Sequence, residues 1–288
     1  MHRSIPEDLP TLPARQADTH KGDYGRALLV GGSLGMSGAI SLCGTAALRS
    51  GAGLATVATA APCLPMVAGY EPSYMTAGLP SDEQGRISNA ARSLLKDLTL
   101  PATSVACGPG LGRSESLQRL TSWLYTTLSQ PSVFDADALF ALAADPDLLS
   151  RGAGPRVLTP HPGEFMRLVP AARQPAADLR QLAVRAAADW GVVVVLKGHR
   201  TLVTDGQRQF VNPSGNPGMA TGGTGDVLSG VITGLLCQGL DPFAAAQLGV
   251  YLHGLAGDLA ASELGQTSLI ASDLLRFLPQ AFQTVTRC

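Results

Sequence analysis

A glycine-rich segment that ends in one acid carries the clearest chemical signal in the sequence. Residues 212–230 read NPSGNPGMATGGTGDVLSG, so a Gly-Gly-Thr-Gly run directly precedes Asp226. Apolar residues then recur at one-turn spacing over positions 227–236, which predicts a helix that begins next to the glycines. The free N–H groups and partial positive charge of such a helix start attract phosphate, and glycines let it approach the backbone. The segment therefore predicts an anion-binding loop.

Asp226 indicates chemistry rather than binding alone, because a carboxylate repels a phosphoryl group. Its simplest role is to remove a proton from a hydroxyl that attacks the phosphoryl group. The structural alternative is a helix N-cap, a common place for Asp, and the GGTGD run taken alone favours that alternative. Asp226, Gly230 and Gly234 share one helix face, which allows close packing beneath the loop. The sequence has no G-x-x-x-x-G-K-[ST] motif, so any nucleotide chemistry uses another architecture than the P-loop.

Five further groups of glycines or polar residues each follow a short apolar run. Ligands of open α/β sheets bind outside the carboxyl ends of the strands, so the five groups predict one shared site. Each group alone has an ordinary explanation as a cap, a turn or a solvated side chain. The groups are Gly31-Gly32-Ser33, Gly108-Pro109-Gly110, Asp135-Ala136-Asp137, His161-Pro162-Gly163-Glu164 and Lys197-Gly198.

The elements that would position these groups alternate between strand and helix, which predicts one α/β domain with a mostly parallel sheet. The length of 288 residues, the 33 glycines and the 45% of apolar residues suit such a domain. We expect an arm over residues 1–20 and a single domain over residues 21–288. The expected elements have the following limits: strands at 26–30, 104–107, 132–134, 157–158 and 192–196, and helices at 38–49, 114–128, 178–190 and from Pro242 onward.

Two finer expectations concern the edges of this domain. Residues 201–204 and 209–211 predict a hairpin, in which Asp205-Gly206 would form a type I′ turn. The arm and the Ala-rich helix after Pro242 offer small-residue surfaces for subunit packing.

Composition excludes several classes of partner. The net charge is −1, with 21 basic and 22 acidic side chains and no basic stripe, so we expect no nucleic-acid partner. No apolar run is long enough to span a bilayer and the N-terminus lacks an apolar signal-peptide core, so we expect no membrane association and a cytoplasmic location. The five cysteines form no CxxC pair, which argues against a metal or disulfide framework, and we expect Cys107 and Cys237 to be buried.

Seven motifs spread over nearly the whole chain resemble the ribokinase-like superfamily and, within it, the NAD(P)H-hydrate dehydratase family. GGTGD is shared with many ribokinase-like kinases, whereas HPGEF combined with LKGxxT, and the N-terminal HKGxxG, are more particular to the dehydratases. The motifs are HKGDYG (20–25), VGGSLGMSGA (30–39), CGPGLG (107–112), DADAL (135–139), TPHPGEF (159–165), VLKGHRT (195–201) and NPGMATGGTGD (216–226).

The resemblance implies an ADP-dependent lyase of the ribokinase-like fold, with helices on both faces of the sheet. Such an enzyme phosphorylates the ring hydroxyl of the S form of NADH or NADPH hydrate. Phosphate then leaves, which restores NADH or NADPH, while ADP becomes AMP. Asp226 would be the catalytic base, and Mg²⁺ is expected beside the nucleotide, with Glu164 ordering its water shell. The residues themselves do not distinguish ADP from ATP.

The resemblance also assigns the binding residues. The hydrate would contact Ala39, Gly110, Gly112, His161 and Asp226. The nucleotide would contact Lys197, Gly198, His199, Arg200, Thr201, Gly222, Gly223, Thr224 and Gly225. Phe140 stands where the family often has Asn after DADAL, so no polar role is assigned there.

The family also implies a homo-oligomer, commonly a tetramer, and a functional partner. Because the sequence begins close to the dehydratase motif, we expect the NAD(P)H-hydrate epimerase on a separate chain. Two other functions stay open: a kinase for a thiamine-precursor alcohol, which would release the phosphorylated alcohol, and a nucleotide-sensing module without turnover. TPHPGEF with VLKGHRT favours the dehydratase over the kinase, and Asp226 argues against the sensor.

Overall fold

Nine strands form one sheet in the part of the chain that the structure, a computed structural model, describes, residues 5–174 and 176–286. Their order across the sheet is β3-β2-β1-β4-β5-β6-β7-β8-β9, and all neighbours pair in parallel up to β7. Strand β8 is antiparallel to both of its neighbours, β7 and β9. The strands are β1 (Arg26–Val30), β2 (Leu54–Ala60), β3 (Met75–Leu79), β4 (Ser104–Cys107), β5 (Ser132–Phe134), β6 (Arg156–Leu158), β7 (Val193–Leu196), β8 (Leu202–Thr204) and β9 (Gln209–Val211).

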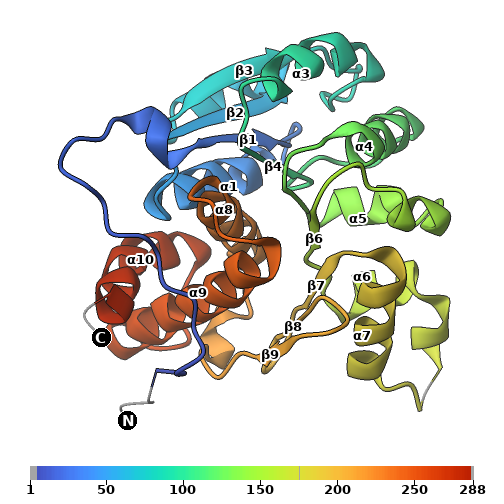
Figure 1. Ribbon diagram of the computed structural model, residues 1–288. Coiled ribbons are helices and arrows are strands. Elements are labelled where there is room, and N and C mark those ends of the chain that lie inside the picture. Colours follow the sequence, from blue (N-terminus) through green and yellow to red (C-terminus); the bar gives the residue numbers. More distant parts are fainter. Residues whose placement is uncertain (1–4, 175, 287–288) are drawn as a thin grey trace.

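Helices cover both faces of this sheet. Figure 1 shows α1, α8, α9 and α10 on one face and α4 to α7 on the other. The predicted mostly parallel sheet between two helical layers is therefore confirmed. The helices are α1 (Ser37–Arg49), α2 (Leu64–Ala68), α3 (Arg92–Thr99), α4 (Glu115–Thr127), α5 (Asp137–Leu142), α6 (Pro162–Leu168), α7 (Leu179–Trp190), α8 (Thr224–Cys237), α9 (Pro242–Leu264) and α10 (Ala271–Thr286).

The central strands are apolar because both of their faces are covered. Every residue of β4, β5, β6 and β7 is buried, as expected for parallel strands between two helical layers. At one end of the sheet the edge strand β3 is more open, and its Met75 side chain is 49% exposed. The sheet therefore holds its middle strands, and the loops that follow them, in a rigid frame.

Close packing of α8 against α1 depends on two glycines of one helix face, as predicted. A methyl group at Gly230 would overlap the carbonyl oxygen of Cys43, and one at Gly234 would lie 2.6 Å from the carbonyl oxygen of Ala47. Without side chains at these two positions, α8 lies directly on α1. The helix that carries Asp226 is thereby held against the sheet from one side.

The hairpin is present, but its predicted turn is wrong. The β8–β9 loop spans residues 205–208, and only Gly206 in it has a positive φ, of 90°. A type I′ turn needs positive φ at both central residues. Instead the Asp205 carboxylate accepts hydrogen bonds from the amides of Gln207 and Arg208, at 2.9 and 2.6 Å, which closes a wider loop.

Several small residues of α9 pack inside the chain, and the predicted subunit-packing surface on the arm and the helices after Pro242 stays a prediction. Side chains at Gly249, Gly254 and Gly257 would collide with Ile232, Ser214 and Met219, respectively. The described part of the arm, residues 5–20, has neither helix nor strand and follows the surface near α9 and α10 (Figure 1).

The arm encloses a cavity of about 430 Å³ together with α9, α10 and the turn after α1. That turn leads into the amino end of β2, so the cavity lies at the edge of the sheet opposite to the carboxyl ends of the strands. The predicted division at residue 20 stays a prediction.

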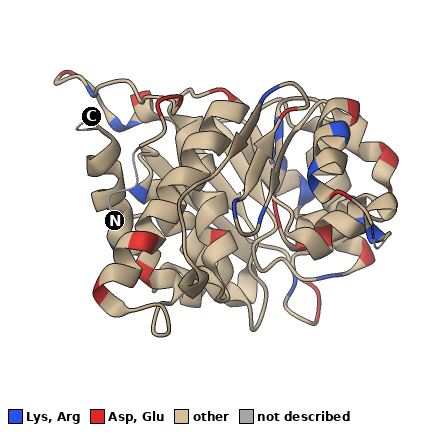
Figure 2. Cartoon of the chain, turned by 90° about the horizontal axis from the view of Figure 1, so that it is seen from below, with Lys and Arg blue, Asp and Glu red and all other residues tan. Residues whose placement is uncertain are grey.

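Charged residues are spread over the chain, and the described thiols are buried. Acidic and basic residues are interspersed over the chain in Figure 2. Among the described residues, no helix combines the length and apolar character that a membrane crossing needs. The four cysteines within this range are buried free thiols, as predicted for Cys107 and Cys237.

We predict that Gly230→Ala destabilises the protein, because the new methyl group meets a backbone carbonyl that cannot rotate away. Overpacking of this kind costs about 1–3 kcal/mol. Gly38→Ala is the matched control: Gly38 lies in α1, and a side chain there meets open space. Thermal unfolding should show a clear drop for Gly230→Ala and none for Gly38→Ala. Equal melting temperatures for both variants would contradict the close α1–α8 contact.

Candidate active site

The five predicted groups come together at one edge of the sheet. They follow β1, β4, β5, β6 and β7, which are consecutive neighbours in the sheet and run parallel. Their carboxyl ends therefore meet at the same edge, as the rule for open α/β sheets requires. The convergence predicted from the sequence is confirmed.

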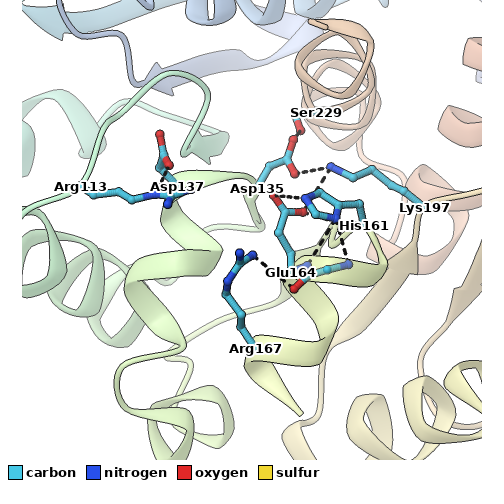
Figure 3. A network of polar contacts seen from close by, with 9 residues as sticks. Arg113, Asp135, Asp137, His161, Glu164, Arg167, Lys197 and Ser229 are labelled. Carbon is cyan, nitrogen blue, oxygen red and sulfur yellow. Dashed lines mark hydrogen bonds and ion pairs between the residues drawn. The ribbon is translucent and has the colours of Figure 1, made fainter. Parts of the chain in front are cut away.

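A buried charge network forms the floor of this edge (Figure 3). Lys197 Nζ donates a hydrogen bond of 2.7 Å to Asp135 Oδ1, and Ser229 Oγ donates one of 2.7 Å to Asp135 Oδ2. The Glu164 carboxylate lies 3.8 Å from Lys197 Nζ. Asp135 is only 1% exposed, and a carboxylate this deeply buried needs such charged and polar partners.

Lys197 keeps its positive charge in this network. Burial alone would lower its pKa, but the nearby carboxylates of Asp135 and Glu164 outweigh that effect, so the pKa is raised above its ordinary value. The lysine at the end of β7 is therefore a fixed cation on the floor of the site.

The glycine-rich loop lies directly above that cation. Helix α8 begins at Thr224, after Gly223 as its N-cap in the left-handed conformation with φ 93°. A side chain at Gly225 would meet Lys197 Nζ at 3.3 Å. The first amides of α8 lack partners within the helix and carry partial positive charge. Free amides next to a lysine are an arrangement that can bind an anion, as predicted for this loop.

Asp226 is not the N-cap of this helix, so the structural alternative from the sequence is wrong. It is the third residue of α8, and its half-buried carboxylate has no hydrogen-bond partner among the residues that the structure describes. Burial, together with the neighbouring charges of Asp135, Asp137 and Glu164, outweighs Lys197 and raises its pKa to about 7. Such a carboxylate can accept a proton near neutral pH.

His161 and Glu164 are tied to each other at the start of α6. His161 Nδ1 accepts the amides of Gly163 and Glu164, at 3.0 and 3.4 Å, and the Glu164 carboxylate accepts the amide of His161 at 2.8 Å. Because Nδ1 is an acceptor, the proton of the neutral ring is on Nε2, 3.3 Å from Glu164 Oε1. His161 is thus a helix cap whose side chain remains 53% exposed toward the site.

The donor set suits Mg²⁺ held through water rather than a closed metal cage. Within residues 5–174 and 176–286, no group of three or more His, Cys, Asp or Glu side chains is arranged to hold a metal ion. Mg²⁺ commonly keeps several waters and takes one or two carboxylates together with substrate phosphates. Glu164 suits a magnesium ion that is held through water, because its oxygens already contact His161 and face Lys197.

Ala39 and Gly110 lie side by side at the other end of the site. A side chain at Gly110, which has φ 60°, would lie 3.1 Å from the Ala39 methyl group and would overlap the Met36 carbonyl oxygen. Gly112 is held separately, because its amide donates a hydrogen bond of 2.9 Å to Asp137. Close backbone contacts explain why this loop is rich in glycine.

The segment 197–201 begins inside the charge network and continues into an exposed turn. Lys197 points into the network, whereas residues 198–200 are exposed. Thr201 Oγ1 donates a hydrogen bond of 3.0 Å to the carbonyl oxygen of Gly198, and Arg180 holds the carbonyl oxygen of Arg200 at 2.9 Å. Arg200 adopts a left-handed backbone with φ 57°, so this tight turn is strained.

Two residues of α9 that sequence analysis did not single out support the glycine-rich loop. His253 Nε2 lies 2.8 Å from the carbonyl oxygen of Thr224. Asp258 accepts hydrogen bonds from the Gly215 amide at 2.9 Å and from Asn216 Nδ2 at 3.0 Å. The sequence could have pointed to them, because a His and an Asp stand within a helix that is otherwise rich in Ala and Gly. Polar residues on a helix that packs into the core usually have a specific role.

Comparisons with known proteins agree with the motifs. A family model described as NAD(P)H-hydrate dehydratase matches residues 27–280. The bifunctional NAD(P)H-hydrate repair enzyme Nnr of Moorella thermoacetica is 47% identical over 277 residues, which are 95% of this chain and 52% of that protein. The chain thus spans about half the length of this and several other bifunctional relatives.

A sequence and a crystal structure from Bacillus subtilis match nearly end to end. The ADP-dependent (S)-NAD(P)H-hydrate dehydratase is 36% identical over 281 residues, covering 95% of this chain and 94% of that protein. The crystal structure of ADP/ATP-dependent NAD(P)H-hydrate dehydratase, co-crystallized with ATP/Mg²⁺, has a TM-score of 0.81 and 34% identity, covering 95% of this chain and 94% of that chain. The family model and these similarities show that the chain belongs to the NAD(P)H-hydrate dehydratase family.

Proposed function

We propose that the chain is an ADP-dependent (S)-NAD(P)H-hydrate dehydratase, a lyase that restores NADH and NADPH from their 6-hydroxy hydrates. One observation carries the proposal: Asp226, a half-buried carboxylate without a hydrogen-bond partner among the described residues, lies in the first turn of the helix whose free amides lie close to Lys197. This places a base next to an anion site, which is the arrangement that phosphorylation of a hydroxyl needs.

The reaction balances in two steps. Asp226 takes the proton of the C6 hydroxyl while that oxygen attacks the terminal phosphorus of ADP, and AMP leaves. The lone pair of the ring nitrogen then expels phosphate from C6, and loss of a proton from C5 restores the dihydronicotinamide ring. Hydrate and ADP thus become NAD(P)H, AMP, phosphate and one proton.

The chain supplies orientation and charge for the first step. The amides of residues 222–225 and the start of α8 stabilise charge that develops on the transferred phosphoryl group, and Lys197 adds a cation below it. We assign the exposed turn 198–201 to the remainder of the nucleotide. Mg²⁺, when bound, neutralises phosphate charge, and Glu164 holds its water shell.

We place the hydrate across the opposite part of the site. Ala39 and Gly110 bring no bulky side chain to this part of the site, and the His161 side chain is 53% exposed. Gly112 shapes the loop through its hydrogen bond to Asp137. This assignment brings the C6 hydroxyl between Asp226 and the anion site.

The other functions considered are not favoured. The matching family model is that of the dehydratase, which argues against a kinase for a thiamine-precursor alcohol. A sensor without turnover does not explain a carboxylate with a raised pKa at an anion site. The bifunctional relatives do not support the expected epimerase on a separate chain, because their names indicate a second activity within one protein.

We also propose a homo-oligomer, with the tetramer as the expected state. The supporting feature is an apolar surface at the sheet edge: Met66, Tyr70 and Met75 of the α2–β3 region are each between 45 and 49% exposed. Exposed apolar groups beside an edge strand suit contact with a second copy. Light scattering that shows only monomer at micromolar concentration would contradict this assignment.

We predict that the purified protein converts NADH hydrate to NADH when ADP and Mg²⁺ are supplied. Absorbance of the reduced nicotinamide should rise, and one phosphate and one AMP should appear per NADH formed. ADP should support faster turnover than ATP in parallel assays, because two relatives, from Bacillus subtilis and Neisseria meningitidis, are named as ADP-dependent. No rise in absorbance with either nucleotide would refute the proposed function.

We predict that Asp226→Asn lowers turnover by about a hundredfold or more, the usual loss when a general base is removed. Wild-type turnover should increase as pH rises through about 7, because Asp226 must be ionised to accept the proton, and the variant should lack this dependence. Asp241→Asn is the matched control, since Asp241 is a true N-cap, at the start of α9, and Asn caps equally well.

The raised pKa of Asp226 also predicts how the stability of Asp226→Asn compares with that of wild type as the pH changes. The native pKa of Asp226 is raised above the unfolded value of about 3.9, so wild-type stability falls as pH rises between about 4 and 7. Asn lacks this titration, so the melting temperature of Asp226→Asn should rise relative to wild type across that window. Normal turnover in Asp226→Asn would remove the carboxylate from the mechanism.

A further inference from the structure

His253 lies beside the anion-binding loop. It belongs to α9, and its ring nitrogen Nε2 is 2.8 Å from the carbonyl oxygen of Thr224, the first residue of α8. A carbonyl oxygen can only accept a hydrogen bond, so Nε2 carries the proton and donates it. The Thr224 side chain is fixed separately, because its hydroxyl donates to carbonyl oxygens of the preceding turn, at 3.1 Å each.

The carbonyl group of Thr224 and the amide N–H of Gly225 belong to one peptide unit. This unit is planar and rigid, so a bond that fixes the carbonyl also fixes the direction of the N–H at its other end. The Gly225 amide is one of the free amides at the start of α8, and a side chain at Gly225 would meet Lys197 Nζ at 3.3 Å. The hydrogen bond from His253 therefore acts on a peptide unit whose amide is one of the free amides at the start of α8, close to Lys197.

Donation to a carbonyl oxygen also polarises its peptide unit. Hydrogen bonds in a chain strengthen one another, so an amide whose own carbonyl accepts a second bond becomes a better donor. The Thr224 carbonyl also occupies an ordinary place in the hydrogen-bond ladder of α8, which makes the bond from His253 an additional one. Removal of His253 thus leaves the helix intact and removes only this second bond.

The ring adds no charge in this position. Burial lowers the pKa of His253 to about 4; the hydrogen bond to Thr224 opposes this shift, and the Lys197 cation adds to it. The imidazole is therefore neutral at physiological pH and donates from a single nitrogen.

We propose that His253 is a positioning residue for phosphoryl transfer: its Nε2–H orients and polarises the Thr224–Gly225 peptide, so that the Gly225 amide points at the transferred phosphoryl group. The proposal rests on the dehydratase function, but its geometric part stands independently of that function. A residue that acts through another donor should affect the transition state more than nucleotide binding.

Three variants separate this role from simple support of the helix. His253→Leu removes the donor, and His253→Gln replaces it with an amide nitrogen of similar reach. Gln247→Leu is the matched control: it removes a different polar contact of the same helix, the 3.0 Å bond from Gln247 to the carbonyl oxygen of Asp8 in the arm. Both Leu variants should lose comparable stability, but only His253→Leu removes a contact to the anion-binding loop.

We predict that His253→Leu lowers kcat about tenfold and changes KM for ADP little. The loss should be smaller than the hundredfold or more that follows removal of a direct oxyanion donor. His253→Gln should recover most of the loss, and Gln247→Leu should keep wild-type kcat. If Gln247→Leu loses as much activity as His253→Leu, or if His253→Leu keeps wild-type kcat, the positioning role is overturned.

A spectroscopic readout tests the geometry without turnover. The sequence contains three Thr-Gly pairs, at 221–222, 224–225 and 233–234, so protein labelled with ¹³C at Thr carbonyls and ¹⁵N at Gly should give three selected amide signals. One of them should move upfield in His253→Leu, move back in His253→Gln, and stay in place in Gln247→Leu. Three unchanged signals in His253→Leu would overturn the proposal.

The dehydratase function and the positioning role of His253 are tested by different outcomes. If wild-type protein does not dehydrate NADH hydrate, the proposed function fails, while the amide signals still test whether His253 polarises the loop. If wild-type protein is active and the amide signals do not respond, the function stands and the role of His253 is wrong.

Discussion

The site depends on an imbalance of charge around a single lysine. Lys197 lies among the carboxylates of Asp135, Glu164 and Asp226, and it forms its direct hydrogen bond with only the first of them. Asp135 has a hydrogen-bond partner at each of its oxygens, Lys197 at one and Ser229 at the other. Asp226 is half-buried and is repelled by the neighbouring carboxylates, and it has no hydrogen-bond partner in the described chain. Burial and this repulsion raise its pKa. One pairing thus separates a hydrogen-bonded carboxylate from the carboxylate that we propose as the base.

The fold maintains this division because each group is attached to a different rigid element. Asp135 follows β5, Lys197 follows β7, and Asp226 lies in the first turn of α8. The parallel pairing of β5, β6 and β7 fixes the distance between the first two. Gly230 and Gly234 let α8 approach α1 closely, which sets the height of the third above the sheet. A shift of α8 would change both the anion loop and the base, since both belong to its first turn.

Much of this architecture was predictable because it depends on local pattern. Strands β4 and β5 have the predicted limits of 104–107 and 132–134, since short apolar runs between turn signals are typical of buried parallel strands. The gathering of five loops at one edge followed from the direction of those strands. Strands β2 and β3 were not predicted, because LATVATA and MTAGL are rich in Ala, Thr and Gly and lack a strong strand pattern.

The interactions that sequence patterns missed connect residues far apart in the chain. Asp226 was assigned a possible cap role because capping depends on where a helix begins, and the structure starts α8 at Thr224. His253 and Thr224 meet only when α9 folds back on α8. Arg156 is 1% exposed at the start of β6 and donates to the carbonyl oxygens of Tyr125 and Leu128 at the end of α4, a helix cap that no local motif indicates.

The most direct test of the account is the ionisation of Asp226 itself. Protein labelled with ¹³C at Asp carboxyl carbons can be titrated by NMR, and the signal that disappears in Asp226→Asn identifies the residue. We expect that signal to titrate with a midpoint near pH 7. An Asp226 midpoint near the ordinary value of about 4 would contradict the central claim that burial and unpaired repulsion make this carboxylate the base.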